Sequence, residues 1–225
     1  MSNRMRDRWL SFTWKRNMLI SHKHKFIFIH IPKTAGTTMR ALLEPVVDDF
    51  TNFLNDEGKK ILSKRIAIGL NPSPIHMNII GVSRILDVRL EEYTLVTAIR
   101  DPFDRFVSYY NYLKFNNPSH RLHPAANKLT LNQFVPFLIN DKEFDTACQY
   151  SFIRRDNKIL MKNVYILKTE QLEEDYKKFC EIFQLPVFPI KSLNKSEGRT
   201  EENLTLDSKI LIHNFERDIE IIYRS

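Results

Sequence analysis

One short segment combines residue types that bind anions. Residues 32–38 read PKTAGTT, with the cation Lys33, the glycine Gly36 and the consecutive hydroxyls of Thr37 and Thr38. The chain has only five glycines in 225 residues, so a glycine at this place is informative. Small residues let backbone N–H groups converge, and the N-terminus of a following helix adds positive potential. The segment therefore predicts a cradle for a phosphate or a similar anion.

The segment differs from the phosphate loop of ATPases and kinases. In that loop a lysine directly follows the second glycine, whereas Lys33 precedes Gly36 by three residues. Those enzymes also need a carboxylate for Mg²⁺ near a strand end, and the strand expected at residues 93–99 is followed by Arg100 instead. Taken alone, the segment fits an anion cradle and an ordinary capped turn equally well.

A second candidate anion site begins at Arg100. An arginine at the carboxyl end of a parallel strand points into the crevice where open α/β sheets bind ligands. Its planar guanidinium suits bidentate bonds to phosphate, and Ser108 lies two turns into the next expected helix. Two anion sites without an evident metal centre suggest a nucleotide that carries phosphates at both ends.

The two segments together resemble a known pair of motifs. HIPKTAGTT at residues 30–38, followed by AIRDPFDRFVSYY at residues 98–110, is similar to the cofactor motifs of sulfotransferases that use 3′-phosphoadenosine 5′-phosphosulfate (PAPS). The amino-acid sequences of the two motifs are most similar to those of the carbohydrate O-sulfotransferases, which include the heparan, dermatan and chondroitin enzymes and their bacterial relatives. The similarity is strong over residues 25–110 and weaker over YILKTEQLEEDYKKFCEIF and SLNKSEGR.

This resemblance implies a donor site and a fold. It places Lys33 on the bridging oxygen of the 5′-phosphosulfate and implies a P-loop-like α/β fold that needs no metal. It assigns the late segment LNKSEGR to a loop that closes over the nucleotide. The further cofactor-binding positions that it implies are Thr34, Ala35, Gly36, Thr37, Thr38, Arg100, Ser108, Lys195 and Ser196.

Sulfuryl transfer requires a group that takes the proton of the acceptor hydroxyl. The hydroxyl attacks sulfur in line with the leaving 5′-phosphate, and Lys33 with the loop amides stabilises the developing charge. A histidine at a similar place serves as the base in the glycan sulfotransferases, so we predict that His76, in NPSPIHMNII, is catalytic. The alternative is a histidine at a helix start without a chemical role. Glu44 is a weaker candidate base, and His30 is expected to give hydrogen-bonded support.

These residues require strands and helices that position them. The apolar runs at 25–31, 93–99 and 163–167 predict buried strands, and the helical patterns between them predict a parallel sheet covered on both faces. Asp101 is expected to cap a helix that starts at Pro102. A last packed helix is predicted at 206–223 from its helically spaced apolar residues: Ile210, Leu211, Phe215, Ile219 and Ile222. The predicted fold is a P-loop-like three-layer α/β domain with a central parallel sheet, spanning 25–225 after a basic arm at 1–24.

The net charge of +7 is concentrated in that arm. Residues 1–25 hold seven basic residues and one acidic residue, and the other 200 hold 27 and 26. This distribution argues against a nucleic-acid partner for the domain and is typical of a solvated arm. An alternative is weak contact with an anionic membrane surface, helped by Trp9, Phe12 and Trp14. No run is apolar enough for a signal peptide or a membrane span, and Cys148 and Cys180 fit a reducing compartment, so we expect a cytoplasmic protein.

The sequence favours one function over two others. The favoured function is a PAPS-dependent O-sulfotransferase that acts on a glycan or another hydroxyl-bearing acceptor. The alternatives are a nucleotide phosphotransferase with a divergent phosphate loop, and a module that binds nucleotide or nucleic acid without catalysis.

Overall fold

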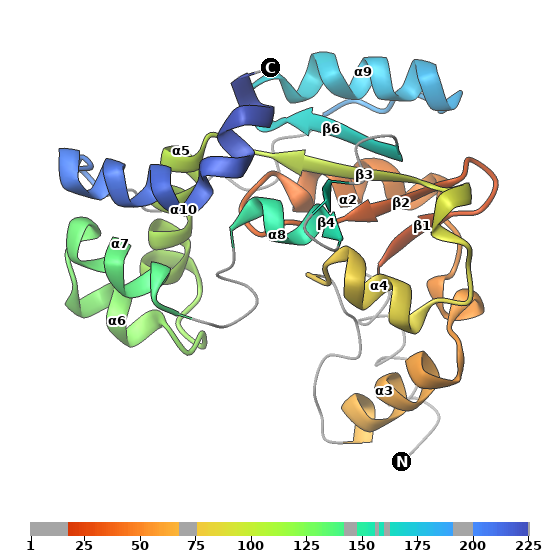
Figure 1. Ribbon diagram of the computed structural model, residues 1–225, viewed down its shortest axis with the longest axis horizontal. Helices are drawn as coiled ribbons and strands as arrows, with labels where there is room; N and C mark the ends of the chain where they lie inside the picture. Colours follow the sequence, from red (N-terminus) through yellow and green to blue (C-terminus); the bar gives the residue numbers. More distant parts are fainter. Residues whose placement is uncertain are drawn as a thin grey trace. The chain divides into compact units, whose positions relative to one another are not determined.

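The computed structural model describes residues 18–67, 76–141, 148–155, 158–159, 163–190 and 200–224. Its main sheet has four strands in the order β1 (Leu19–Ser21), β2 (Phe26–Ile29), β3 (Thr94–Ile99) and β6 (Val164–Lys168). β2 and β3 are parallel, with Phe26 opposite Thr94, and β6 runs beside β3 in the same direction (Figure 1). With helices flanking this sheet, the predicted α/β class is confirmed, and the three strands expected from the apolar runs are present.

β1 corrects the prediction of a wholly parallel sheet. It pairs antiparallel with β2, with Leu19 opposite Phe28, so the sheet is mixed. Only the four residues 22–25 separate the two strands, with Lys25 at a φ of 53°. A connection this short can join only antiparallel neighbours, because parallel strands need a long crossover. β1 lies within the residues that the sequence assigned to the basic arm.

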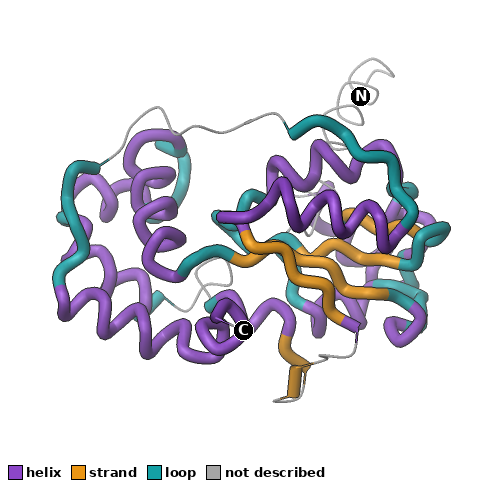
Figure 2. Tube along the Cα trace, turned by 90° about the horizontal axis from the view of Figure 1, so that it is seen from above, coloured by secondary structure: helices purple, strands orange, loops and turns teal. Residues whose placement is uncertain are grey.

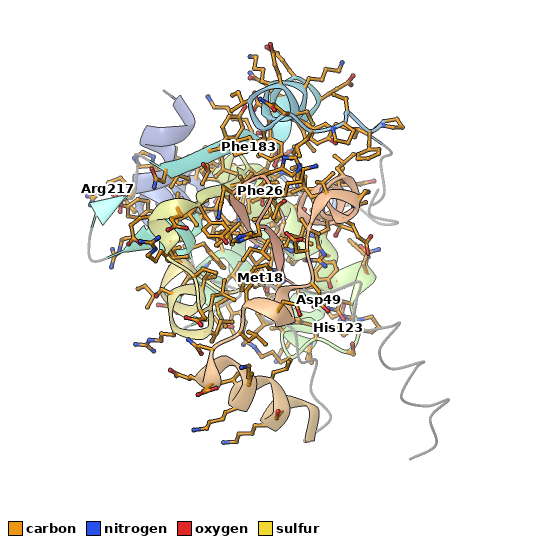
Figure 3. The ribbon with its side chains drawn as sticks, turned by 90° about the vertical axis from the view of Figure 1, so that its right-hand side faces the viewer. Met18, Phe26, Asp49, His123, Phe183 and Arg217 are labelled. Atoms are coloured by element: carbon orange, nitrogen blue, oxygen red, sulfur yellow. The ribbon has the colours of Figure 1, made fainter. Side chains whose placement is uncertain are left out.

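The chain divides into two compact units, and the first is drawn from residues 1–30, 43–97 and 153–165. It contains β1, β2 and most of β3, with α3 (Asp56–Ala67) packed on α4 (Ile79–Ile85). Phe26 of β2, labelled in Figure 3, is fully buried. Gly58 allows α3 to approach α4 closely, because a Cβ there would lie 2.4 Å from the carbonyl oxygen of Ile85. β4 (Arg154–Arg155) and β5 (Lys158–Ile159) form a separate two-stranded sheet (Figure 2).

The second unit is drawn from residues 31–42, 98–152 and 166–225 and is mainly helical. Its longer helices are α2 (Gly36–Leu43), α5 (Pro102–Asn111), α7 (Leu131–Ile139), α9 (Leu172–Phe183) and α10 (Leu206–Arg224). It also contains α6 (His123–Lys128), most of α8 (Gln149–Ile153) and a π-helix at Tyr112–Asn116. One apolar cluster joins α5, α7 and α10 through residues such as Tyr110, Phe134 and Ile212.

Two helix predictions can be checked in detail. The Asp101 carboxylate accepts a hydrogen bond from the backbone N–H of Asp104 at 3.0 Å and Pro102 is the first residue of α5, so the predicted cap is confirmed. The predicted apolar stripe of α10 is wrong in part. Ile210 and Leu211 are exposed, whereas the predicted Ile219 is buried, together with Ile212 and Glu216, which were not predicted.

Candidate functional site

The loop between β2 and α2 has the backbone shape of an anion cradle. Lys33 and Ala35 lie in the left-handed region, with φ of 68° and 60°, and Thr34 between them does not. Non-glycine residues rarely adopt this strained conformation, and those that do are found most often at functional sites. Alternating left-handed residues also turn successive N–H groups toward one concavity, which is the arrangement that binds anions.

The threonines of this loop have different surroundings. Thr34 is buried, and its hydroxyl donates a hydrogen bond to the carbonyl oxygen of Ile31 at 2.9 Å, so this side chain closes the loop. Gly36 begins α2 and is buried, while Thr37 is exposed and Thr38 is half-buried in the same first turn. That turn has no acidic residue, so the positive potential of the helix N-terminus is not offset locally.

Lys33 is a cation in a desolvated place. Burial, and after it the positive charge of Arg100, lower its pKa from 10.5 to about 8. Its Nζ lies 4.0 Å from the centroid of the Tyr112 ring, so the aromatic face takes part of the role of water around the ammonium. Tyr112 is the first residue of the π-helix after α5. The two sequence motifs did not link Tyr112 to Lys33, because the contact depends on how the chain folds.

Arg100 is fixed by its backbone and has an unsatisfied donor in its side chain. Its N–H donates to Oε1 of Gln149 and its carbonyl accepts from Nε2 of Gln149, both at 2.9 Å. Its Nε is buried and has no hydrogen-bond partner among the described residues. A buried donor without a partner costs free energy, and a bound phosphate oxygen would satisfy it. Arg100 thus has an unsatisfied Nε donor, and its charge lowers the pKa of Lys33. Both features suit a nucleotide phosphate held by Lys33 and Arg100.

The roles of the remaining donor-site residues stay predictions. Ser108 is half-buried on α5, four residues before Tyr112, and its hydroxyl as a phosphate ligand stays a prediction. Lys195 and Ser196 lie outside the described residues. In the part of the chain that the structure describes, no three His, Cys, Asp or Glu side chains are grouped to hold a metal ion. No helix there is long and apolar enough to cross a membrane.

His76 is held at the carboxyl end of β2, within the first unit. Its Nδ1 lies 3.1 Å from the backbone carbonyl oxygen of His30, and the two rings are 4.5 Å apart at an angle of 60°. A carbonyl oxygen can only accept, so Nδ1 carries the hydrogen in this bond and the neutral ring has its lone pair on Nε2. This tautomer suits a base, and the supporting role expected of His30 is consistent with the contact.

The weaker candidate base Glu44 and the two histidines His120 and His123 are less suited to act as the base than His76. Glu44 is exposed at the start of a short 3₁₀ turn with Pro45. His120 accepts from the N–H of Leu122, and His123 donates to the carbonyl oxygen of Leu113 at 2.6 Å. Both rings thus bind their own segment of the chain.

Comparison with known proteins assigns the chain to a family. The model of a family described as the sulfotransferase family matches residues 16–221, which include both candidate anion-binding segments and His76. No curated protein matches the chain. The family match extends over most of the 225 residues and agrees with the α/β fold and the paired cations. The chain therefore belongs to the sulfotransferase family.

Proposed function

We propose that the protein transfers a sulfuryl group from PAPS to a hydroxyl of a carbohydrate acceptor. The observation that carries the proposal is the pair of Lys33 and Arg100. Lys33 follows β2, Arg100 directly follows the neighbouring β3, and the charge of Arg100 lowers the pKa of Lys33. Two coupled cations, one with an orphaned buried donor, favour a ligand with more than one anionic group.

In this proposal the chain binds the donor at two places. Lys33 and the backbone N–H groups from Thr34 to Thr38 bind the 5′-phosphosulfate, and Arg100 with Ser108 binds the 3′-phosphate. Lys195 and Ser196 close over the nucleotide. When bound, PAPS supplies a sulfuryl group on a phosphate leaving group, and the protein contributes orientation and charge.

Lys33 stabilises the charge that develops on the leaving oxygen. With a pKa of about 8 it is mostly protonated at neutral pH, and a neighbouring phosphate would raise that pKa again. An ammonium that is already desolvated needs little reorganisation when negative charge appears beside it. The face of Tyr112 holds it before the ligand arrives.

His76 takes the proton of the acceptor hydroxyl at Nε2. The bond from its Nδ1–H to the carbonyl of His30 fixes the ring orientation and stabilises the imidazolium that forms. The amino-acid sequences of the two motifs support a carbohydrate acceptor, because they resemble those of the glycan sulfotransferases.

The first experiment compares nucleotides by calorimetry without added metal. We expect 3′,5′-bisphosphoadenosine to bind more tightly than ATP. Equal or stronger binding of ATP with Mg²⁺ would overturn the assignment in favour of a phosphotransferase. A transfer screen with labelled PAPS over oligosaccharide acceptors, read by mass spectrometry, then tests the acceptor class. Nucleotide binding without transfer to any acceptor would favour a non-catalytic module.

A further inference from the structure

A buried polar network lies behind the two candidate phosphate-binding segments. Its side chains are Arg105 of α5, Gln149 of α8 and Glu216 of α10, which are 4%, 0% and 1% exposed. All three belong to the second unit. None of them is assigned a role in the reaction proposed above, and burial of two charges and an amide in one place is costly unless each is well paired.

Each oxygen of the Glu216 carboxylate begins a separate chain of hydrogen bonds, here called a branch, to a different segment. Oε1 accepts from Nη1 of Arg105 at 2.5 Å, and Nε of Arg105 donates to the carbonyl oxygen of Pro32 at 3.1 Å. Pro32 directly precedes Lys33, so this branch ends at the predicted cradle for the 5′-phosphosulfate.

The other branch ends at Arg100. Oε2 of Glu216 accepts from the backbone N–H of Gln149 at 2.9 Å. The Gln149 side chain in turn binds both backbone groups of Arg100. One carboxylate on α10 thus holds the backbone behind both candidate phosphate sites, although it is more than a hundred residues away from Arg105 in sequence.

Stability alone is a weak reason for such a network. A buried ion pair contributes little net free energy compared with apolar residues of similar volume, because both ions must leave water. Burial raises the pKa of the Glu216 carboxyl, and Arg105 with Gln149 counteracts that rise. What an apolar core could not supply is a fixed direction for the carbonyl of Pro32 and for both backbone groups of Arg100.

We propose that Glu216 is a positioning residue that holds the two phosphate-binding segments in place through Arg105 and Gln149. This inference rests on the proposed function. Arg105 then supports the segment that binds the 5′ end of the nucleotide, and Gln149 supports the segment that binds the 3′ end.

The test uses three variants and two half-ligands on the full chain. Affinities for adenosine 5′-phosphate and adenosine 3′-phosphate are measured by calorimetry for Arg105→Lys, Gln149→Met and Glu216→Gln. Lysine keeps a charge for Glu216 but lacks the fork that also reaches Pro32. Glutamine at 216 presents an NH₂ group where one oxygen now accepts, so it cannot serve both branches. Exposed Glu181→Gln on α9 is the matched control.

We expect a pattern that simple loss of stability cannot produce. Arg105→Lys weakens the binding of adenosine 5′-phosphate by about tenfold, and Gln149→Met weakens the binding of adenosine 3′-phosphate by a similar factor. Glu216→Gln weakens the binding of both. Losses of this size are typical when a residue that orients a ligand-binding group is replaced. The control changes neither affinity. If Glu216→Gln does not fold, the opposite preferences of the other two variants still test the proposal.

Two results would overturn the inference. Unchanged affinities, or equal losses for both half-ligands in all variants, would reduce the network to a structural ion pair while leaving the proposed function intact. A wild-type chain that binds neither half-ligand nor 3′,5′-bisphosphoadenosine would overturn the proposed function, and the inference with it.

Discussion

The side chain of Gln149 binds both backbone groups of Arg100, accepting from its N–H and donating to its carbonyl at 2.9 Å each. The pair of bonds resembles what a neighbouring strand would offer at the next position after the end of β3. Arg100 therefore leaves the sheet in a defined direction, while its Nε keeps a donor that has no hydrogen-bond partner among the described residues. The amide of Gln149 does not ionise, so these two bonds do not depend on its protonation state.

Gln149→Leu should lower the free energy of unfolding by about 2–4 kcal/mol. The substitution leaves the backbone N–H and carbonyl of Arg100 without their partner, and each such loss costs on the order of 1–3 kcal/mol. Urea denaturation at pH 7 measures the change, with exposed Gln171→Leu as the control, because the Gln171 side chain makes no capping hydrogen bond to α9. A loss below 1 kcal/mol would indicate that water replaces the amide at Arg100.

Lys33→Met should stabilise the protein near neutral pH while removing donor binding. The pKa of Lys33 is about 8 in the folded chain and 10.5 for a free side chain, so the unfolded chain binds more protons between these values. The stability of the wild-type protein should therefore rise from pH 8 to pH 10.5. The gain from the substitution, roughly 2–3 kcal/mol, should be full below pH 8 and fade across that range.

Urea denaturation at pH 7 and at pH 10 measures this gain. The matched control is Lys128→Met, which removes an exposed lysine at the end of α6. No gain at pH 7 would show that the ammonium of Lys33 is better solvated than its burial indicates.

Tyr112→Leu should weaken binding of adenosine 5′-phosphate by about three- to tenfold. The ring holds the ammonium of Lys33, and a cation over an aromatic face is worth about 0.5–2 kcal/mol. Tyr112→Phe is the control, since it keeps the ring and loses only the hydroxyl that accepts from Asn117. Calorimetry with both variants separates the two contributions. Tighter binding in the leucine variant would mean that the ring draws Lys33 away from the ligand.

The parts of this protein that could be predicted from sequence are those with local signals. Short apolar runs predict the strands β2, β3 and β6, and Asp101 with Pro102 predicts the start of α5. β1 was missed because three residues carry no periodicity, and its place depends on pairing with β2.

The partners that support the site depend on long-range pairing, which no local pattern reveals. Gln149 and Glu216 reach Arg100 and Arg105 across 49 and 111 residues. A signal for Glu216 did exist, because it lies between Phe215 and Ile219 on the buried face of α10. A carboxylate at an apolar helix position predicts a buried cation as its partner, and Arg105 is that cation.

His76→Ala should lower turnover by about 10²–10⁴-fold while leaving the affinity for 3′,5′-bisphosphoadenosine nearly unchanged. The reason is that a general base acts on the acceptor hydroxyl and its loss typically costs that factor. Steady-state transfer assays and calorimetry measure the two quantities. His213→Ala on the exposed side of α10 is the control and should keep full turnover. Retained turnover in the His76 variant would remove it as the base.

Arg105→Met and Glu216→Leu should each destabilise the protein by about 3–5 kcal/mol, because each leaves an unpaired charge in the core. The double variant should lose less stability than the two single variants added together, since no charge is left unpaired, although the Pro32 carbonyl and the Gln149 N–H still lack partners. Urea denaturation of the single and double variants gives the coupling free energy. Nucleotide affinity should not recover in the double variant, because neither Pro32 nor Gln149 regains its partner. Recovery of both stability and affinity would show that the pair serves packing alone.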